Sequence, residues 1–401
     1  MAPSLKKILN YRYKPILTIL FMAIIGIYIF QTISGISSWR SNYTYFNSPQ
    51  AEIDFNKKIK EGTGELVDPE DGLFLYYNLE NDQVIYADTF DKYKDYHLTI
   101  FYSNEDANQL AYNAYPYYNE NFFILLTIFV ITGVMLFLFD LRSQFTATLF
   151  STKYTRSSIY WYKIKLVGGA LFLFLLIGKS LSFFAYHFFI PNHYLNISYT
   201  QHILSTLSGG ITLLALFALS CFIGLLFGEW LYGIGTILAL FLTFSMFLSN
   251  IDLIYQTFFI DDSKMISTVS TTFLNYILPI LQTSLQPMNW SSLICLSLFA
   301  LLSLLLGRKI FANISLETTG NFILVPKFNR LFQIILIVYG MTISAVPIIL
   351  TTLLPSEAMS ISEILINCFV ILASFIAYFL LSEYILYQNK SKIIQKVSFF
   401  N

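Results

Sequence analysis

The chain has 401 residues, of which 56% are hydrophobic, 18% are aromatic and only 12% are charged. Soluble domains carry about 25% charged residues, so this composition excludes a water-soluble globular protein and indicates one that is embedded in lipid. The 24 lysines and arginines equal the 24 aspartates and glutamates, and this balance predicts no nucleic-acid partner.

Eight apolar runs are long enough, or nearly so, to cross a membrane, since a hydrocarbon core of roughly 30 Å needs about 20 residues of helix. They lie at residues 16–36, 122–139, 164–189, 203–227, 231–248, 293–306, 332–354 and 361–387. We therefore predict an all-α polytopic membrane protein with about eight transmembrane helices. A small α+β extracellular domain is expected between helices 1 and 2.

Residues 1–36 comprise a basic N-terminal tail and the first transmembrane helix. Four lysines and arginines lie within residues 6–14, and no convincing cleavage site of small residues follows the apolar run. We expect an uncleaved span with a cytoplasmic N-terminus, because basic residues favour that side. Eight alternating spans keep the basic clusters at 140–165, at 307–330 and after residue 388 on the same side, so both termini are predicted to be cytoplasmic.

Residues 37–121 are too many for a simple loop and too polar for the membrane, so they are predicted to form the extracellular domain. Runs of β-branched and aromatic residues at 73–79, 84–86 and 97–102 predict antiparallel strands, and Asn81-Asp82 is typical of a turn. This segment contains six lysines and arginines and fifteen carboxylates, which gives it a formal charge of −9. This charge favours a solvated acidic surface, with the binding of cationic ligands or metal ions as the alternative.

Residues 122–312 carry helices 2–6, and residues 313–401 carry two additional helices and a cytoplasmic tail. The moderately apolar stretch 267–287 contains Pro279 and is short for a full span. If it crossed the membrane, the basic loop at 307–330 would lie outside, so an interfacial or re-entrant helix pair is expected instead.

Gly178-Lys179-Ser180 matches the end of a phosphate-binding loop, but Leu173 replaces the required earlier glycine and no strand precedes it. The chain is therefore predicted to bind no nucleotide. Lys179 lies 14 residues beyond Lys165, or about 21 Å along a helix, which is most of the way across the membrane. Two interpretations of it stay open, namely snorkelling to the outer headgroups and lining a translocation path.

Recognisable catalytic and metal-binding patterns are absent from the sequence. The three cysteines each lie in an apolar run and are expected to pack as small hydrophobic residues. The four histidines are expected at exposed or interfacial positions, because no pair has the i, i+4 spacing of a helical zinc site. They are His97, His187, His193 and His202. We therefore predict that the chain is no enzyme and holds no metal or cofactor.

The loop after the second span, at 140–163, is the most informative stretch. Apolar residues recur at helical spacing from Leu141 to Phe150, which predicts a short amphipathic helix on the membrane surface within about 140–158. A basic segment then re-enters the bilayer. Such a helix can also serve only as an anchor.

A second pattern in this loop is an acidic residue, Asp140, followed by Leu149-Phe150, Arg156, Ile159-Tyr160 and Lys163. In these residues the sequence resembles the permease subunits of bacterial type-2 ATP-binding cassette exporters, which place a coupling helix with such a pattern after their second span. The resemblance extends over residues 1–312 through the order of the spans and the large outside insert. The last two spans depart from the six-span pattern.

The resemblance implies a permease subunit that couples ATP hydrolysis by separate cytoplasmic ABC ATPase subunits to export of a substrate across a bacterial cell membrane. It implies that ATP binds the partner subunits and that a second permease protomer, identical or a sister chain, completes the assembly within membrane lipid. The residues that it implies for the ATPase contact are Asp140, Arg142, Phe145, Leu149, Phe150, Lys153 and Arg156. The substrate is not specified by these residues.

Two other classes of function stay open. A polytopic sensor or assembly factor that displays the extracellular domain predicts no ATPase partner. A membrane-embedded enzyme acting on lipids predicts carboxylates or histidines clustered at one membrane face, with His187, His193 and His202 as the candidates.

Overall fold

The computed structural model covers the whole chain. The structure describes residues 4–61, 67–68, 72–78, 83–103, 112–114, 117–118, 122–228, 230–259, 290–314, 322–353 and 361–387. The expected turn at Asn81-Asp82 and the expected re-entrant stretch at 267–287 lie outside these residues.

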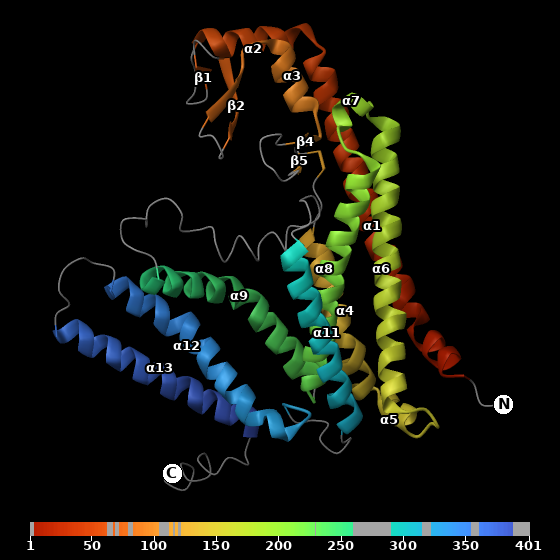
Figure 1. Cartoon of the computed structure of the whole chain (residues 1–401), viewed down its shortest axis with the longest axis vertical. Helices are drawn as coiled ribbons and strands as arrows, with labels where there is room; N and C mark the ends of the chain where they lie inside the picture. The colour runs from red at the N-terminus through yellow and green to blue at the C-terminus, as the bar shows by residue number, and fades with distance from the viewer. Residues whose placement is uncertain are drawn as a thin grey trace. The chain divides into compact units, whose positions relative to one another are not determined.

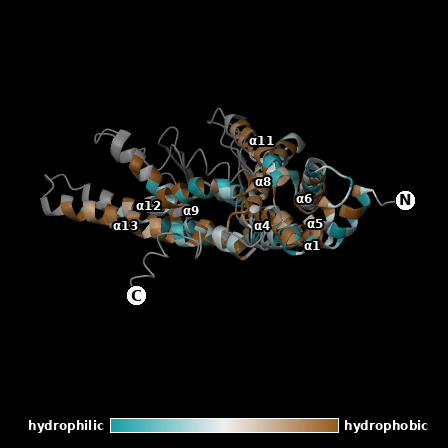
Figure 2. Ribbon diagram, turned by 90° about the horizontal axis from the view of Figure 1, so that it is seen from below, coloured by the Kyte–Doolittle hydropathy of each residue, from teal (hydrophilic) through white to brown (hydrophobic). Residues whose placement is uncertain are grey.

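Seven helices of the described chain are long and apolar enough to cross a membrane, so the protein is membrane-embedded. They are α1 (Leu5–Phe46), α4 (Phe122–Arg142), α6 (Arg156–Phe189), α8 (Tyr199–Leu226), α11 (Trp290–Asn313), α12 (Asn329–Leu353) and α13 (Ile361–Tyr387). The fifth expected span, at 231–248, also lies in a helix, α9 (Trp230–Phe259). Hydrophobic residues cover much of α11, α12 and α13 (Figure 2).

Two of these helices extend well beyond the apolar runs that predicted them. Helix α1 has 42 residues and includes the basic tail, where Ser4 caps it by accepting a hydrogen bond from the Lys7 amide at 3.4 Å. Helix α6 begins at Arg156, eight residues before the expected start. Hydropathy predicts only the part of a helix that lies in hydrocarbon, and the backbone hydrogen bonds continue past it.

The chain divides into two compact units. Each of the helices α4, α6, α8 and α11 has one part in the first unit and the other part in the second. The first unit contains Met1–Phe129, Ile164–Leu214 and Pro279–Ser297. The second contains Val130–Lys163, Ala215–Leu278 and Leu298–Asn401. Each unit has its own packed core.

The first unit contains a small α+β part, which lies at the end of α1 away from the N-terminus (Figure 1). Strand β2 pairs antiparallel with β3 in a register that sets Leu73 opposite Ala87 and Asn78 opposite Gln83, and β1 adds to the other edge of β2. This confirms the strands expected at 73–79 and 84–86. The elements are α2 (Pro49–Glu61), β1 (Val67–Asp68), β2 (Gly72–Asn78), β3 (Gln83–Ala87), α3 (Phe90–Leu98), β4 (Phe101–Ser103) and β5 (Tyr112–Ala114).

The strand expected at 97–102 is wrong in its first half. His97 and Leu98 form the last turn of α3, and only Phe101–Ser103 pairs as a strand, with β5. Tertiary packing overrides the β preference here, because Leu98 is fully buried in a core cluster with Phe46 and Ala51.

Hydrogen bonds join the α+β part to the long helices of the first unit. The Trp39 indole of α1 donates to the Leu98 carbonyl at 2.8 Å, and Tyr186 of α6 donates to the Tyr117 carbonyl at 2.7 Å. The Ile100 amide donates to the carbonyl of Tyr194 in α7 (Asn192–Leu195) at 2.7 Å. Gly35 permits this approach, since a Cβ there would lie 2.0 Å from the Tyr186 hydroxyl oxygen.

In the second unit, α12 packs against both α9 and α13. Thr243 and Tyr339 share a hydrogen bond of 2.8 Å between their hydroxyls, and the Asn250 amide donates to the Thr342 carbonyl at 2.9 Å. The connection before α12, which includes a 3-10 helix (Pro326–Phe328), bonds to the end of α8 through the Leu324 amide and the Leu226 carbonyl at 2.7 Å. Helices α12 and α13 therefore belong to the fold of this unit.

We expect the α+β part to lose stability as the pH falls from 7 to 4. Burial, and secondly the nearby Lys58 cation, lower the pKa of His97 from 6.5 to about 4. The unfolded chain binds a proton near pH 6.5 while the folded chain stays neutral until about pH 4, so stability falls across that window by about 2 kcal/mol after allowance for solvent screening. Below pH 4 this residue causes no further loss.

The measurement is hydrogen exchange of α3 amides between pH 7 and 4.5, corrected for intrinsic rates. His97→Phe preserves the ring stacked on Phe46, whose centroid lies 5.5 Å from that of His97, and it should flatten the pH dependence in this window. An unchanged slope in the variant would contradict this assignment.

Candidate functional site

The candidate site is the junction of α4 and α6 at residues 140–163, here called the corner. Helix α4 ends at Arg142, Gln144 adopts a left-handed conformation with φ of 54°, and α5 (Phe145–Phe150) follows. Helix α6 then begins at Arg156. The surface helix expected within 140–158 is therefore a six-residue segment bounded by two turns, because the left-handed residue breaks the helical path of α4.

A buried ion pair joins the two long helices of the corner. Lys163 Nζ donates to Asp140 Oδ2 at 2.6 Å, and both side chains have 0% exposure. The ammonium group also lies 5.4 Å and 5.7 Å from the ring centroids of Phe137 and Phe311, where cation–π attraction adds to the ion pair. Since an isolated buried charge is very costly, each partner requires the other, and the last turn of α4 is held against α6.

Arg156 ties the corner to the end of α11. Its Nη1 donates to the carbonyl oxygens of Ala312 and Ile314 at 2.9 and 3.0 Å, which satisfies acceptors that a helix end leaves unpaired. Its guanidinium carbon lies 4.2 Å from the ring centroid of Phe150. One side chain therefore holds α5 and the end of α11 together.

Aromatic residues fill the space beneath the corner. Tyr160 stacks on Phe137 with ring centroids 5.5 Å apart, and its hydroxyl donates to the Leu304 carbonyl at 2.8 Å. Phe311 packs edge-on against Phe137 and Phe150 at 5.5 and 5.4 Å. Gly307 leaves room for this contact, since a Cβ there would lie 2.7 Å from the Tyr160 hydroxyl oxygen.

The seven residues implied for the ATPase contact fall into three groups. Asp140 and Leu149 are fully buried and support the corner from within. Phe150 and Arg156 contact each other and residues of α11. The remaining three, Arg142, Phe145 and Lys153, lie on the outer surface, where both cations are exposed and Phe145 is half-buried.

Lys163 is part of the pattern that resembles exporter permeases, but the sequence alone did not predict its pairing with Asp140. The available signal was a lysine at the start of an apolar run that follows an aspartate at the end of the preceding one. Charges at such positions are expensive in lipid and are usually paired, so Asp140 and Lys163 were natural partners. Phe311 lies about 150 residues further along the chain, and no local pattern connects it to the corner.

Lys179 lies in a separate polar cluster of the first unit, between α6 and α8. Its side chain is 2% exposed and donates to Ser205 Oγ at 3.2 Å. His202 stacks on Phe183 with ring centroids 3.9 Å apart and is 8% exposed, so its expected exposed position is wrong. His193, by contrast, keeps an exposed side chain near Asp95.

Gly178-Lys179-Ser180 lies within the continuous helix α6, and the glycine has a packing role. A Cβ at Gly178 would lie 2.4 Å from the ring of Tyr28, so the glycine lets α1 and α6 approach closely. Cys221 is buried, and all three cysteines are free. The described residues contain no group of three His, Cys, Asp or Glu side chains that could hold a metal ion.

No protein family, curated protein or solved structure matches this chain at a significant level. Any function assigned to it therefore rests on its own residues. Among the described residues, the corner combines a buried ion pair, a helix-capping arginine and a small cationic and aromatic outer surface.

We expect Asp140→Leu to destabilise the protein by about 3–5 kcal/mol, because Lys163 would remain buried without its carboxylate. The double variant Asp140→Leu with Lys163→Met should recover much of this loss, since both buried charges are then gone. Thermal unfolding in detergent measures both effects. Lys153→Met, at an exposed position, is the control and should change stability by less than about 0.5 kcal/mol.

Two results would contradict the ion-pair account. One is a single variant as stable as the Lys153→Met control. The other is a double variant no more stable than Asp140→Leu alone.

Proposed function

We propose that this chain is the permease subunit of an ATP-binding cassette exporter and that the corner is its coupling element. The observation that carries the proposal is the buried Asp140–Lys163 pair, which binds the corner to two long helices. The sequence pattern around this pair is the one that resembles type-2 exporter permeases.

A coupling element must satisfy two physical requirements. It must present a surface that a soluble partner can reach, and it must move with the spanning helices as one body. The exposed side chains of Arg142 and Lys153 offer a surface that a soluble partner can reach. The Asp140–Lys163 ion pair and the Arg156 cap connect the corner to the spanning helices. Helices α4 and α6, with 21 and 34 residues, are about 32 and 51 Å long and would carry a tilt of the corner through the bilayer.

The proposal assigns distinct roles to the corner residues. Arg142, Phe145 and Lys153 contact the ATPase, and their chemistry fits a groove that combines acidic and apolar side chains. Asp140, Leu149 and Lys163 are positioning residues, because they have no exposed surface. ATP binds the partner subunit, and a second permease protomer, identical or a sister chain, encloses the path.

The proposal places the protein in a bacterial cell membrane with eight spans and both termini in the cytoplasm. Its basic residues at the N-terminus, the corner and the connection before α12 support this orientation. The direction of transport rests on the resemblance. The buried polar cluster of Lys179, Ser205 and His202 is a candidate lining of the path.

A sensor or assembly factor is the second candidate. The hydrogen bonds that join the α+β part to α1 and α6 favour it, because they would transmit a change in that part to the spanning helices. This function requires no ATPase partner, and a purification experiment separates the two.

The test is affinity purification of the full chain in mild detergent, with mass spectrometry and an ATPase assay on the co-purified proteins. We expect a cytoplasmic ATPase in stoichiometric amount. The double variant Phe145→Ala with Lys153→Ala should reduce its recovery at least fivefold without lowering thermal stability, since it removes an aromatic and a cationic contact.

Lys327→Ala with Phe328→Ala is the matched control, because it removes an exposed cation and an exposed aromatic residue elsewhere in the second unit. It should leave the recovery unchanged. Purification of the folded chain alone would overturn the permease proposal and favour the sensor. Equal losses in both double variants would overturn the assignment of the corner.

A further inference from the structure

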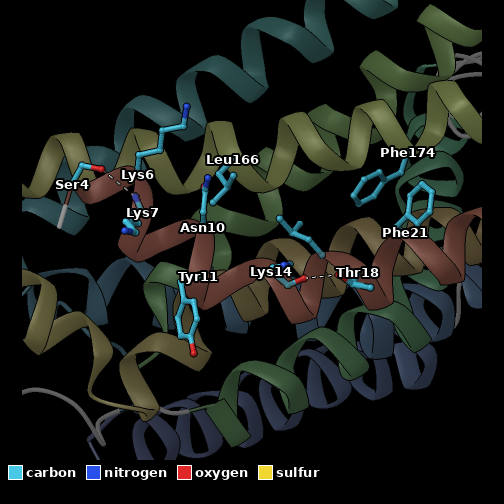
Figure 3. Close-up of a pocket in the computed structure, with 11 residues that line it drawn as sticks. Ser4, Lys6, Lys7, Asn10, Tyr11, Lys14, Thr18, Phe21, Leu166 and Phe174 are labelled. Atoms are coloured by element: carbon cyan, nitrogen blue, oxygen red, sulfur yellow. Dashed lines mark hydrogen bonds between the residues drawn. The ribbon is translucent and has the colours of Figure 1, made fainter.

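A groove of about 790 Å³ runs along the N-terminal half of α1, where α1 faces α6 (Figure 3). All of its lining residues belong to the first unit. It shares no residue with the corner or with the polar cluster around Lys179. The groove is therefore a feature that the proposed coupling function does not use.

The stretch of the groove from Lys6 to Lys14 is cationic. Lys6, Lys7 and Lys14 line it and are exposed, and none of the lining residues is acidic. Lys7 and Lys14 are seven residues apart, so they lie two turns apart on the same face of α1. Asn10 and Tyr11, between them, add polar groups. This end has the chemistry of a site for a phosphate group.

The other end is apolar. The rings of Phe21 and Phe174 meet edge to face there, with centroids 5.1 Å apart, and Leu17 lines the groove one turn before Phe21. Figure 3 shows Lys6 and Lys7 at one side of the view and the two phenylalanines at the other, with Lys14 between them. The groove thus changes along α1 from a surface for charged groups to a surface for hydrocarbon.

The length of this gradient fits a single lipid leaflet. Lys7 and Phe21 are 14 residues apart, or about 21 Å along the helix. Half of a bilayer that is about 40–45 Å thick with its headgroups has nearly the same depth. A lipid whose phosphate lies at the lysines would therefore have its acyl chain beside Phe21 and Phe174.

We propose that the groove between α1 and α6 is a binding site for one anionic phospholipid. The phosphate and the anionic headgroup bind Lys6, Lys7 and Lys14, and an acyl chain lies along Leu17 to the Phe21–Phe174 pair. A zwitterionic headgroup would leave the cationic end less well neutralised, and a soluble phosphate would leave the apolar end exposed to water. Bound lipid would stabilise the packing of α1 on α6, because a ligand that binds only the folded state raises the free energy of unfolding as its concentration exceeds its Kd.

The first test compares phosphatidylglycerol with phosphatidylcholine of the same acyl chains, added to the delipidated full chain in neutral detergent. Native mass spectrometry counts the bound lipids, and thermal unfolding gives the apparent affinity. We expect one retained phosphatidylglycerol and a preference of at least tenfold over phosphatidylcholine, since each lysine near an anionic headgroup adds to binding. Equal binding of the two lipids would overturn the proposal.

A triple variant, with Lys6, Lys7 and Lys14 changed to Gln, should abolish the preference. The matched control changes Lys57, Lys58 and Lys60 to Gln, which removes the same charge from exposed positions on α2. It should keep the full preference. A preference that survives in the groove variant, or that falls equally in both, would overturn the site.

A second pair of variants tests the apolar half. Thr18→Trp places an indole in the groove and should reduce phosphatidylglycerol binding at least fivefold. Thr44→Trp is its control, because Thr44 is an exposed residue of α1 whose hydroxyl likewise bonds to the carbonyl four residues earlier. Glycerol phosphate should not compete with the lipid, because it has no acyl chain. Effective competition by glycerol phosphate, or unchanged phosphatidylglycerol binding in Thr18→Trp, would overturn the acyl-chain groove and leave only an anion site.

Discussion

The buried ion pair between Asp140 and Lys163 is the interaction on which the account of this protein depends. Two opposite charges 2.6 Å apart, with no exposed surface, are stable only together, since removal of one leaves the other desolvated and uncompensated. The pair joins the end of α4 to the beginning of α6. It therefore holds the end of α4 against α6 at the corner.

The surroundings of the pair reinforce this constraint. Phe137 and Phe311 place ring faces near the ammonium group, and Arg156 caps α11 while it covers Phe150. Small residues bring α4 and α8 together nearby, because a Cβ at Gly133 or Gly224 would lie 2.7 or 2.5 Å from a backbone oxygen of the other helix. The inner side chains of the corner thus belong to the core of its unit.

The sequence located the apolar helices because lipid imposes a simple requirement of about 20 apolar residues per span. Helix α13 has the expected bounds of 361–387, and the strands at 73–79 and 84–86 followed from their content of β-branched and aromatic residues. Helix α1 was predicted too short at both ends, since its polar extensions carry no hydropathy signal. The failure at His97 and Leu98 has another cause, because burial against Phe46 and Ala51 decided their conformation.

The short helix at the candidate site was predicted from the sequence, but the arrangement of its side chains was not. The spacing of apolar residues indicated a surface helix after the second span, and the structure has α5 there. It did not indicate which side chains lie inside, because Asp140 pairs with Lys163, 23 residues later, and Lys163 lies near the ring of Phe311 in a distant helix. The lysine-lined groove was also missed, since its apolar wall comes partly from Leu166 and Phe174 of another helix.

Hydrogen exchange across the corner tests the central claim most directly. If the ion pair fixes the corner, amides of Phe145–Phe150 should exchange nearly as slowly as the adjoining turns of α4 and α6 in the purified wild-type chain. Asp140→Leu should then accelerate their exchange at least tenfold, while α12 stays unchanged. Exchange at the rate of a free loop in the wild type, or no acceleration in the variant, would contradict the claim that this pair makes the corner rigid.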